Sequence, residues 1–220
     1  MQHPIFEYLS KLEQNNNKIW FEANRKEFEH ARNELLAIAG NLIEKISVFD
    51  SSLGQLEPKK CIFRQHRDVR FSKNKDPYKT TMSAYFAAGG KSSSSAGYYL
   101  HLEPGKSFVG GGIYSPPPDI LKAIRTEIYF NGTNFESIIN DEEFRNIFGE
   151  LMNDKLQRPP KNFPTEFPQI ELLKYKHYVV SRKFDPEKMN SVDIESFAHE
   201  TFKSMFPFNQ FLNKALTNVE

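Results

Sequence analysis

Residues 97–114 constrain the fold more than any other stretch, because they predict two antiparallel strands joined by a tight turn. Side chains alternate in character along 97–103, Pro104-Gly105 is typical of a turn, and 106–114 continues as a second strand. Neighbouring side chains of a strand point to opposite faces of the sheet. One face of this hairpin should therefore be apolar and the other should carry the chemistry. The first face holds Tyr98, Leu100 and Leu102, and the second holds Tyr99, His101 and Glu103.

The second strand of the hairpin contains three consecutive glycines, Gly110, Gly111 and Gly112. Three residues without side chains weaken a strand, and they allow another backbone or a ligand to approach closely. We therefore expect these glycines to form the floor of a binding pocket, together with Tyr99 and His101.

The predicted fold class is α+β: a single domain over residues 1–220, in which an antiparallel sheet packs against a long N-terminal helix and C-terminal helices. The chain has 220 residues, of which 39% are hydrophobic, and this is enough for one substantial core. An apolar stripe predicts the long helix over 20–49. A second stripe predicts a helix from Ser191 that Pro207 interrupts.

The sheet should form around residues 80–114. Aromatic and β-branched residues predict a further strand within 175–184. Residues 59–63 also favour a short strand, in which the lone cysteine, Cys61, would be a small buried core residue rather than a nucleophile.

The stretch 61–79 concentrates positive charge in a chain whose net charge is only +1, since it sets six Lys and Arg residues against two aspartates. A guanidinium group offers a rigid fork of donors that suits phosphate or carboxylate. We expect the stretch to be a loop that wraps over the sheet and roofs a pocket for a phosphorylated or carboxylated small molecule. Its candidate ligand contacts are Arg64, Arg67, Asp68, Arg70, Lys73, Tyr78 and Lys79.

Four of these residues also have a structural interpretation. Asp68 lies between Arg67 and Arg70, so it should remain ionised and orient the arginines rather than accept a proton. Alternatively, the arginines are struts that pair with carboxylates and fix the loop. The Tyr78 hydroxyl either contributes to the pocket, or its ring covers the sheet.

His101 and Glu103 are the candidate catalytic pair. Residues two apart on a strand face the same way, and histidine exchanges protons near neutral pH. The alternative is a histidine without a chemical role on a solvated face, unless the basic loop folds over it. Whether the protein is an enzyme stays open at this point.

No cofactor and no metal site is predicted, because the spacings typical of zinc, calcium and dinucleotide sites do not occur. Gly90-Lys91-Ser92 lacks the preceding glycine that a phosphate-binding loop requires. We expect a cytoplasmic protein without membrane contact, since neither a secretory signal nor a long apolar run is found.

The alternative function is that of a non-catalytic module that binds nucleic acid or protein. In the nucleic-acid case the same basic loop would contact phosphates, and Tyr78, Tyr98 or Tyr99 would stack on bases. The small net charge excludes attraction of nucleic acid by the whole surface, so any binding would use this local patch. The sequence does not indicate an oligomeric state.

The basic stretch also carries a resemblance. Its pattern Arg64-x-x-Arg67-Asp68-x-Arg70-Phe71-x-x-x-Lys75-x-Pro77-Tyr78-Lys79 resembles the signature of the bacterial domain of unknown function 2461 family. Further similar segments follow the same order along the chain: 15–25, 97–105, the glycine triplet, 156–160 and 180–182. The resemblance implies one compact domain of a bacterial cytosolic protein, and it implies no catalytic residues, because the family has no assigned activity.

Overall fold

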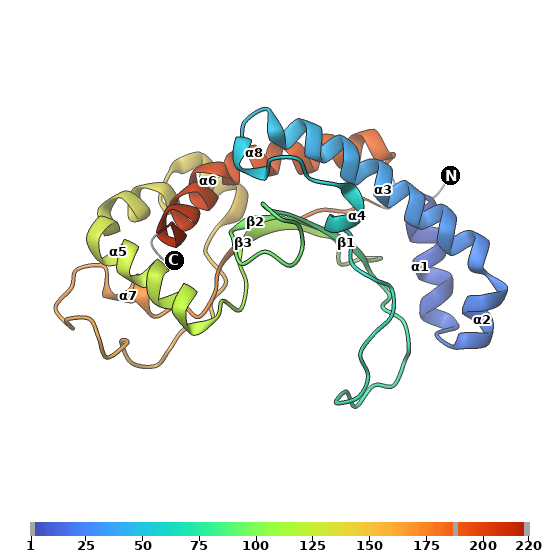
Figure 1. Ribbon diagram of the computed structural model, residues 1–220, viewed down its shortest axis with the longest axis horizontal. Coiled ribbons are helices and arrows are strands. Elements are labelled where there is room, and N and C mark those ends of the chain that lie inside the picture. The colour runs from blue at the N-terminus through green and yellow to red at the C-terminus, as the bar shows by residue number, and fades with distance from the viewer. Residues whose placement is uncertain (1–2, 187–188, 218–220) are drawn as a thin grey trace.

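The computed structural model describes residues 3–186 and 189–217, and its centre is a four-stranded antiparallel sheet (Figure 1). The strands follow one another across the sheet in chain order: β1 (Met82–Phe86), β2 (Gly97–Leu102), β3 (Phe108–Ile113) and β4 (Tyr178–Lys183). The helices are α1 (Pro4–Gln14), α2 (Lys18–Ala23), α3 (Arg25–Ser47), the 3-10 turn η1 (Ser51–Leu53), α4 (Pro58–Cys61), α5 (Pro118–Ile139), α6 (Glu142–Phe148), α7 (Ile170–Leu173) and α8 (Ser191–Leu216). The α+β prediction is confirmed.

Helices α3 and α8 cover one face of the sheet (Figure 1). The apolar residues of β2 point to this face, and Leu100 is fully buried opposite Ala84 of β1. Tyr98 is buried on the same face, where its hydroxyl donates to Asp50 Oδ2 at 2.7 Å. The alternation predicted for 97–103 is therefore present. Among the residues that the structure describes, no helical layer covers the opposite face of the sheet (Figure 1).

The glycines of β3 allow the sheet to approach α8 closely. A Cβ on Gly111 would collide with the carbonyl oxygen of Gly97 and with Met205 Sδ of α8. A Cβ on Gly112 would collide with the carbonyl oxygen of Tyr178, and Gly112 has a φ of 103°, which favours glycine. Gly111 and Gly112 are thus required by packing on α8 and on the neighbouring backbone, whereas a Cβ on Gly110 would meet the Val180 carbonyl oxygen of β4 at 2.7 Å.

The long helix predicted over 20–49 is divided at Asn24. The side chain of Asn17 caps α2 by accepting from the Trp20 N–H at 3.0 Å, and α2 ends when Asn24 Nδ2 donates to the Trp20 carbonyl at 2.8 Å. Because an asparagine side chain competes with the backbone for hydrogen bonds, it favours such a break. The apolar stripe then continues along α3.

Two further predictions of secondary structure are wrong. Residues 58–61 form the helical turn α4, which Pro58 starts. Pairing with the sheet begins after it, where Ile62 lies opposite Ala84 and the Phe63 N–H donates to the Ser83 carbonyl at 3.0 Å. Helix α8 runs through Pro207 without interruption. It is buried on both sides of the proline, at Met205 and at Phe208, so packing outweighs the cost of a proline within a helix.

Cys61 lies in the core, as predicted, with no exposed surface. Burial raises the pKa of its thiol to about 11, so the thiol is neutral at physiological pH. None of the helices in the described part of the chain combines the length and the apolar character needed to cross a membrane.

The packing of β3 on α8 yields a stability prediction. Gly111→Ala should lower the free energy of unfolding by about 2 kcal/mol or more, because its methyl group must displace backbone or Met205. Gly40→Ala on α3 is the control: its Cβ would lie 3.6 Å from Pro58 Cγ, an ordinary contact, and alanine is the better helix former. Urea unfolding measures both, and equal stability of the two variants would contradict the packing argument.

Candidate functional site

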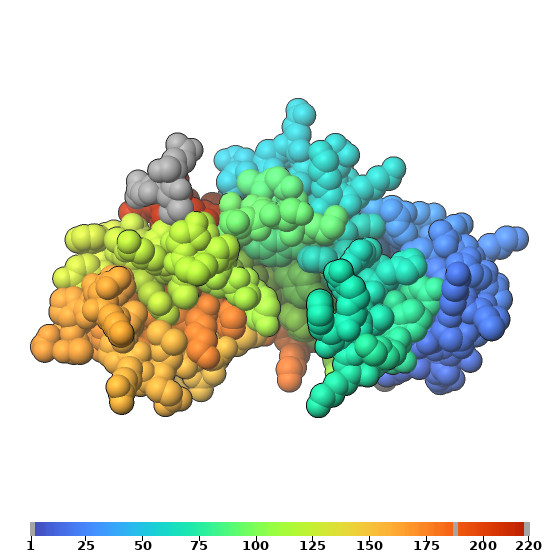
Figure 2. All heavy atoms as spheres, turned by 60° about the horizontal axis from the view of Figure 1, so that its bottom comes forward, coloured from blue at the N-terminus to red at the C-terminus, as the bar shows by residue number. Residues whose placement is uncertain are grey.

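The face of the sheet that lacks helices lies at the bottom of a hollow in the molecular surface (Figure 2). One wall is the basic segment after Ile62, and the other is formed by the chain that leads from β3 into α5 together with the chain around residues 155–175 (Figure 2). A series of hydrogen-bonded polar side chains on β2 lies on this open face, and a cavity lined by cations lies at the outer edge of β1.

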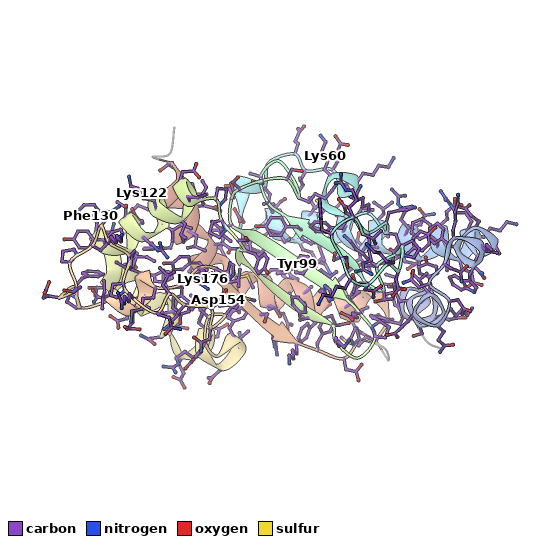
Figure 3. All side chains as sticks on the ribbon, turned by 90° about the horizontal axis from the view of Figure 1, so that it is seen from below. Lys60, Tyr99, Lys122, Phe130, Asp154 and Lys176 are labelled. Atoms are coloured by element: carbon purple, nitrogen blue, oxygen red, sulfur yellow. The ribbon has the colours of Figure 1, made fainter. Side chains whose placement is uncertain are left out.

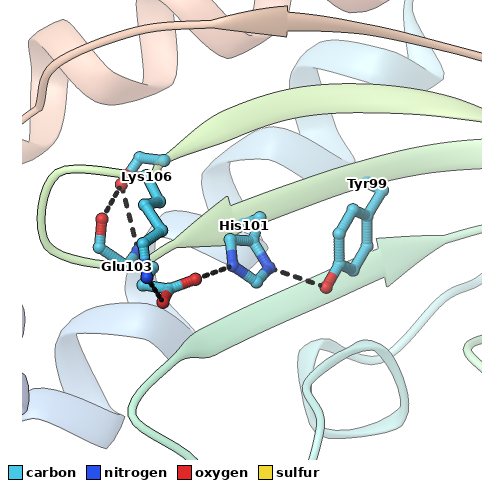
Figure 4. A network of polar contacts seen from close by, with 5 residues as sticks. Tyr99, His101, Glu103 and Lys106 are labelled. Carbon is cyan, nitrogen blue, oxygen red and sulfur yellow. Dashed lines mark hydrogen bonds and ion pairs between the residues drawn. The ribbon is translucent and has the colours of Figure 1, made fainter. Parts of the chain in front are cut away.

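Tyr99, His101 and Glu103 form a continuous hydrogen-bonded chain on the open face (Figure 4). Tyr99 Oη lies 3.0 Å from His101 Nδ1, and His101 Nε2 lies 3.0 Å from Glu103 Oε2. The Lys106 ammonium group pairs with the other Glu103 oxygen at 3.2 Å. The His101 ring stacks on Phe108 of β3, with centroids 4.6 Å apart and planes 18° apart. The predicted pair is thus brought together.

The hydrogen bonds indicate which atoms of Tyr99, His101 and Glu103 carry a proton. Burial acts to raise the pKa of Glu103, but hydrogen bonds from His101 and Lys106 outweigh it and hold that pKa below its ordinary value. An ionised carboxylate only accepts hydrogen bonds, so His101 Nε2 donates to Glu103. In neutral His101 the Nδ1 atom is then an acceptor, and it receives the hydrogen bond of the Tyr99 hydroxyl.

Local structure fixes Glu103 at the end of β2. Its N–H donates to Ser107 Oγ at 3.0 Å, and the Ser107 hydroxyl donates to the Glu103 carbonyl at 2.8 Å. The Lys106 N–H donates to the same carbonyl at 3.0 Å and so closes the turn. The turn contains Gly105, whose φ is 68°. Gly110 is the register partner of Tyr99 on β3, so no side chain of that partner covers the tyrosine ring.

The basic segment is a hairpin that extends from the edge of β1 (Figure 1). Its two arms pair at His66 and Tyr78, and the Arg67 N–H donates to the Pro77 carbonyl at 2.9 Å. It borders the hollow as a wall (Figure 2), so the expectation that it roofs the sheet is corrected. The physical reason is this pairing between its own arms, which directs the segment away from the strands.

Several predicted ligand contacts are engaged within this hairpin. The Arg67 guanidinium donates to the Asp76 carbonyl at 3.1 Å and to Ser72 Oγ at 3.3 Å. Arg70 forms a bidentate ion pair with Asp68, with distances of 2.6 and 2.9 Å, and these hydrogen bonds lower the pKa of Asp68. Both arginines therefore act within the hairpin, and Asp68 orients Arg70.

Tyr78 and Tyr98 have no ring face available to a ligand. Tyr78 stacks on Phe21 of α2, with ring centroids 4.0 Å apart, and is only 3% exposed. Its backbone pairs with the Asn16 side chain at 2.9 and 3.1 Å. Tyr98 faces the helices, as does Gly111. Tyr78, Tyr98 and Gly111 are therefore not part of the candidate site.

Arg64 and Lys79 lie in a different environment, a cavity of about 570 Å³ at the outer edge of β1. The cationic groups that line it come from α3, α4, the base of the hairpin and the loop after β1. They are Arg32, Lys59, Arg64, Lys79 and Lys91, with His66 beside them. Burial and the charge of Arg64 lower the pKa of Lys79. The sequence did not indicate Arg32, Lys59 or Lys91, because no spacing connects them.

Phe63 connects the cavity with the open face of the sheet. Its ring lines the cavity and is 36% exposed. Its centroid lies 6.2 Å from that of Tyr99, and the Lys79 ammonium group lies 5.5 Å from the Phe63 centroid. The Phe63 ring therefore lies between the predicted basic residues Arg64 and Lys79 and the polar residues of β2. The other predicted basic residues, Arg67, Arg70 and Lys73, belong to the projecting part of the hairpin.

A second histidine–carboxylate pair, which the sequence did not suggest, lies on the same side of the molecule (Figure 3). His177 Nε2 is 3.1 Å from Asp154 Oδ2, and the hydrogen bond from Lys176 lowers the pKa of Asp154. The Ser115 N–H donates to His177 Nδ1 at 2.9 Å. A backbone N–H, unlike a hydroxyl, does not give up its proton, so Nδ1 of His177 has no proton to accept and we assign this histidine a structural role. Within the described residues, no group of three or more His, Cys, Asp or Glu side chains could hold a metal ion.

The fold and this site define an α+β protein with an open sheet face, a half-buried series of hydrogen-bonded polar side chains on that face, and a cationic cavity. A family model described as a conserved hypothetical protein, DUF2461, matches residues 4–211. The chain belongs to this family, as the resemblance predicted. No curated protein and no solved structure shows a significant match to the chain.

Proposed function

We propose that the protein binds a small organic anion, carrying a phosphate or carboxylate group, in the cationic cavity. The observation that supports this most is the lining: five Lys and Arg side chains converge from separate segments, and no carboxylate of the described residues lines the cavity with them. None of the five forms an ion pair with a carboxylate within residues 3–186 and 189–217. Their charges are therefore available to a ligand.

The environment of Lys79 favours an anion over water. Its pKa is lowered by burial and by the charge of Arg64. Keeping both groups charged and close together therefore costs free energy. An anion placed between them offsets that repulsion. A guanidinium and an ammonium group together suit the several oxygens of a phosphate or carboxylate.

The remaining lining suits the organic part of such a ligand. Apolar side chains of Phe28, Leu35, Phe63 and Met82 line the cavity beside the cations. Its volume of about 570 Å³ lies in the range of small-molecule sites, about 300–1,000 Å³. We infer a small, partly apolar molecule with at least one anionic group.

Inorganic pyrophosphate is a suitable first probe by isothermal titration calorimetry. Arg64→Gln and Lys79→Gln should each weaken binding by about tenfold or more, because each removes a charged hydrogen bond. Affinity should also fall as pH rises, and at a lower pH than an ordinary lysine would cause, because the pKa of Lys79 is lowered. The control variants are Arg70→Gln and Lys73→Gln in the hairpin. If they weaken binding as much as the cavity variants, the cavity is not the site.

A second candidate function is supported by the tip of the hairpin. Phe71 is 96% exposed, and the Arg70 guanidinium carbon lies 5.9 Å from its ring centroid. An exposed aromatic ring next to cations is the arrangement that holds single-stranded nucleic acid by stacking and phosphate contacts. Arg70, Lys73 and Phe71 would form this contact.

The nucleic-acid candidate predicts binding of a fluorescent single-stranded oligonucleotide that weakens steeply as salt rises. Phe71→Ala should reduce the affinity by at least about fivefold, since one stacked base contributes about 1–3 kcal/mol. Phe130→Ala on α5 is a matched control, because Phe130 is 73% exposed on a different part of the surface. Absence of binding at low salt would remove this candidate.

A further inference from the structure

The hydrogen-bonded groups of Tyr99, His101 and Glu103 on β2 stand in the order that activates a nucleophile. A hydroxyl contacts an imidazole nitrogen, and the other imidazole nitrogen contacts a carboxylate. In this arrangement the imidazole takes the proton of the hydroxyl, and the carboxylate orients the ring and stabilises its positive form. Tyrosine supplies the hydroxyl here, and tyrosine is among the side chains that form covalent intermediates.

We propose that Tyr99 is the nucleophile of an acyl-transfer site, activated by His101 and Glu103, whose substrate is an anionic acyl compound. The choice of an anionic substrate rests on the proposed function, in which the cavity beside Phe63 holds the charged end. The assignment of Tyr99 rests on the geometry of the open sheet face alone.

The rigidity of His101 supports this assignment. Its ring is held by Phe108 on one face and by hydrogen bonds at both nitrogens, and its side chain is only 15% exposed. Glu103 is 22% exposed and also forms an ion pair with Lys106, so its carboxylate is held beside the His101 ring. An imidazole that must accept a proton without moving needs this kind of support.

The environment of Tyr99 makes a base necessary. Burial raises the pKa of its hydroxyl, so the phenol keeps its proton at neutral pH and phenolate is scarce. A neutral hydroxyl reacts as a nucleophile when its proton leaves while the new bond forms. His101 Nδ1, at 3.0 Å, is placed to receive that proton.

The reaction balances with water as its only co-reactant. Tyr99 Oη attacks the acyl carbon, the bond between that carbon and the leaving group breaks, and His101 Nδ1 takes the hydroxyl proton and passes it to the leaving group. The product is an ester of the tyrosine. Phenyl esters are reactive, so water can attack the same carbon while His101 takes one of its protons. The bond between the acyl carbon and Tyr99 Oη then breaks, His101 passes the proton to Oη, and the free acid and Tyr99 are released.

The position of Phe63 connects this nucleophile with the cavity. Phe63 lines the cavity and contacts Tyr99 edge to face, with centroids 6.2 Å apart. A ligand whose anionic group lies between Arg64 and Lys79 can extend along the Phe63 ring towards the open sheet face. The anionic end would then select the molecule, and the acyl group would meet Tyr99.

The experiment uses 4-(fluorosulfonyl)benzoate, an anionic electrophile whose adduct with tyrosine is stable. Tyr99 Oη would bond to sulfur while fluoride leaves, and mass spectrometry of peptides would locate the adduct. Tyr99 should react at least about tenfold faster than Tyr114 in the same molecule, although Tyr114 is 69% exposed. The Tyr99 hydroxyl is hydrogen-bonded to an imidazole nitrogen, whereas Tyr114 contacts His177 by ring stacking.

Matched variants separate the roles of the residues. His101→Phe keeps an aromatic ring on Phe108 but should slow the modification of Tyr99 by about 100-fold, the effect of losing a general base. Glu103→Gln should slow it by about tenfold, since only the charge that stabilises the imidazolium is lost. Melting temperatures of the variants check that the fold is kept, and the unchanged reaction of Tyr114 checks the probe.

Different failures identify different errors. If Tyr99 reacts no faster than Tyr114, or if His101→Phe leaves its rate unchanged, the assignment of Tyr99 is overturned even when pyrophosphate binds in the cavity. Neutral benzenesulfonyl fluoride tests whether the site prefers an anionic substrate. Arg64→Gln should slow the anionic probe and not the neutral one, and equal effects on both probes would overturn the anionic substrate.

Discussion

The close contact between β3 and α8 is the constraint on which the other features depend. Gly111 lies against Met205 without room for a Cβ, and Gly112 lies against Phe208 in a backbone conformation that favours glycine. This contact places α8 on one face of the sheet, where α3 joins it. Alternate residues of β2 must then divide between a helical core and an open face, which is how Tyr99 and His101 come to lie outside the core.

The same architecture explains why cations converge at the edge of β1. Helix α3 crosses above this edge and presents Arg32, while Ile62 pairs with β1 and starts the basic hairpin. Arg64 and Lys79 lie at the base of that hairpin, where its two arms leave the sheet. The arginines further along it close hydrogen bonds within the hairpin. In our proposal, the groups at the base of the hairpin bind a ligand, and the arginines further along hold the hairpin together.

Sequence reasoning succeeded where the relevant contacts are local. The pair of His101 and Glu103 follows from their spacing on one strand, and the strands follow from alternation and from Pro104-Gly105. It failed where contacts join distant segments. Arg32 and Lys91 share a cavity although no sequence pattern relates them, and the bonds of Arg67 to Ser72 and Asp76 arise only when the hairpin closes. Pro207 shows the same limit, because packing outweighs a local preference.

The central claim is that the anion site is the cavity at the base of the hairpin rather than the arginines along it. A crystal soaked with selenate, whose anomalous scattering locates the ion, tests this most directly. The account predicts the strongest anomalous peak inside the cavity, within hydrogen-bond reach of Arg64 and Lys79. A peak found only beside Arg67 and Arg70, with an empty cavity, would contradict it.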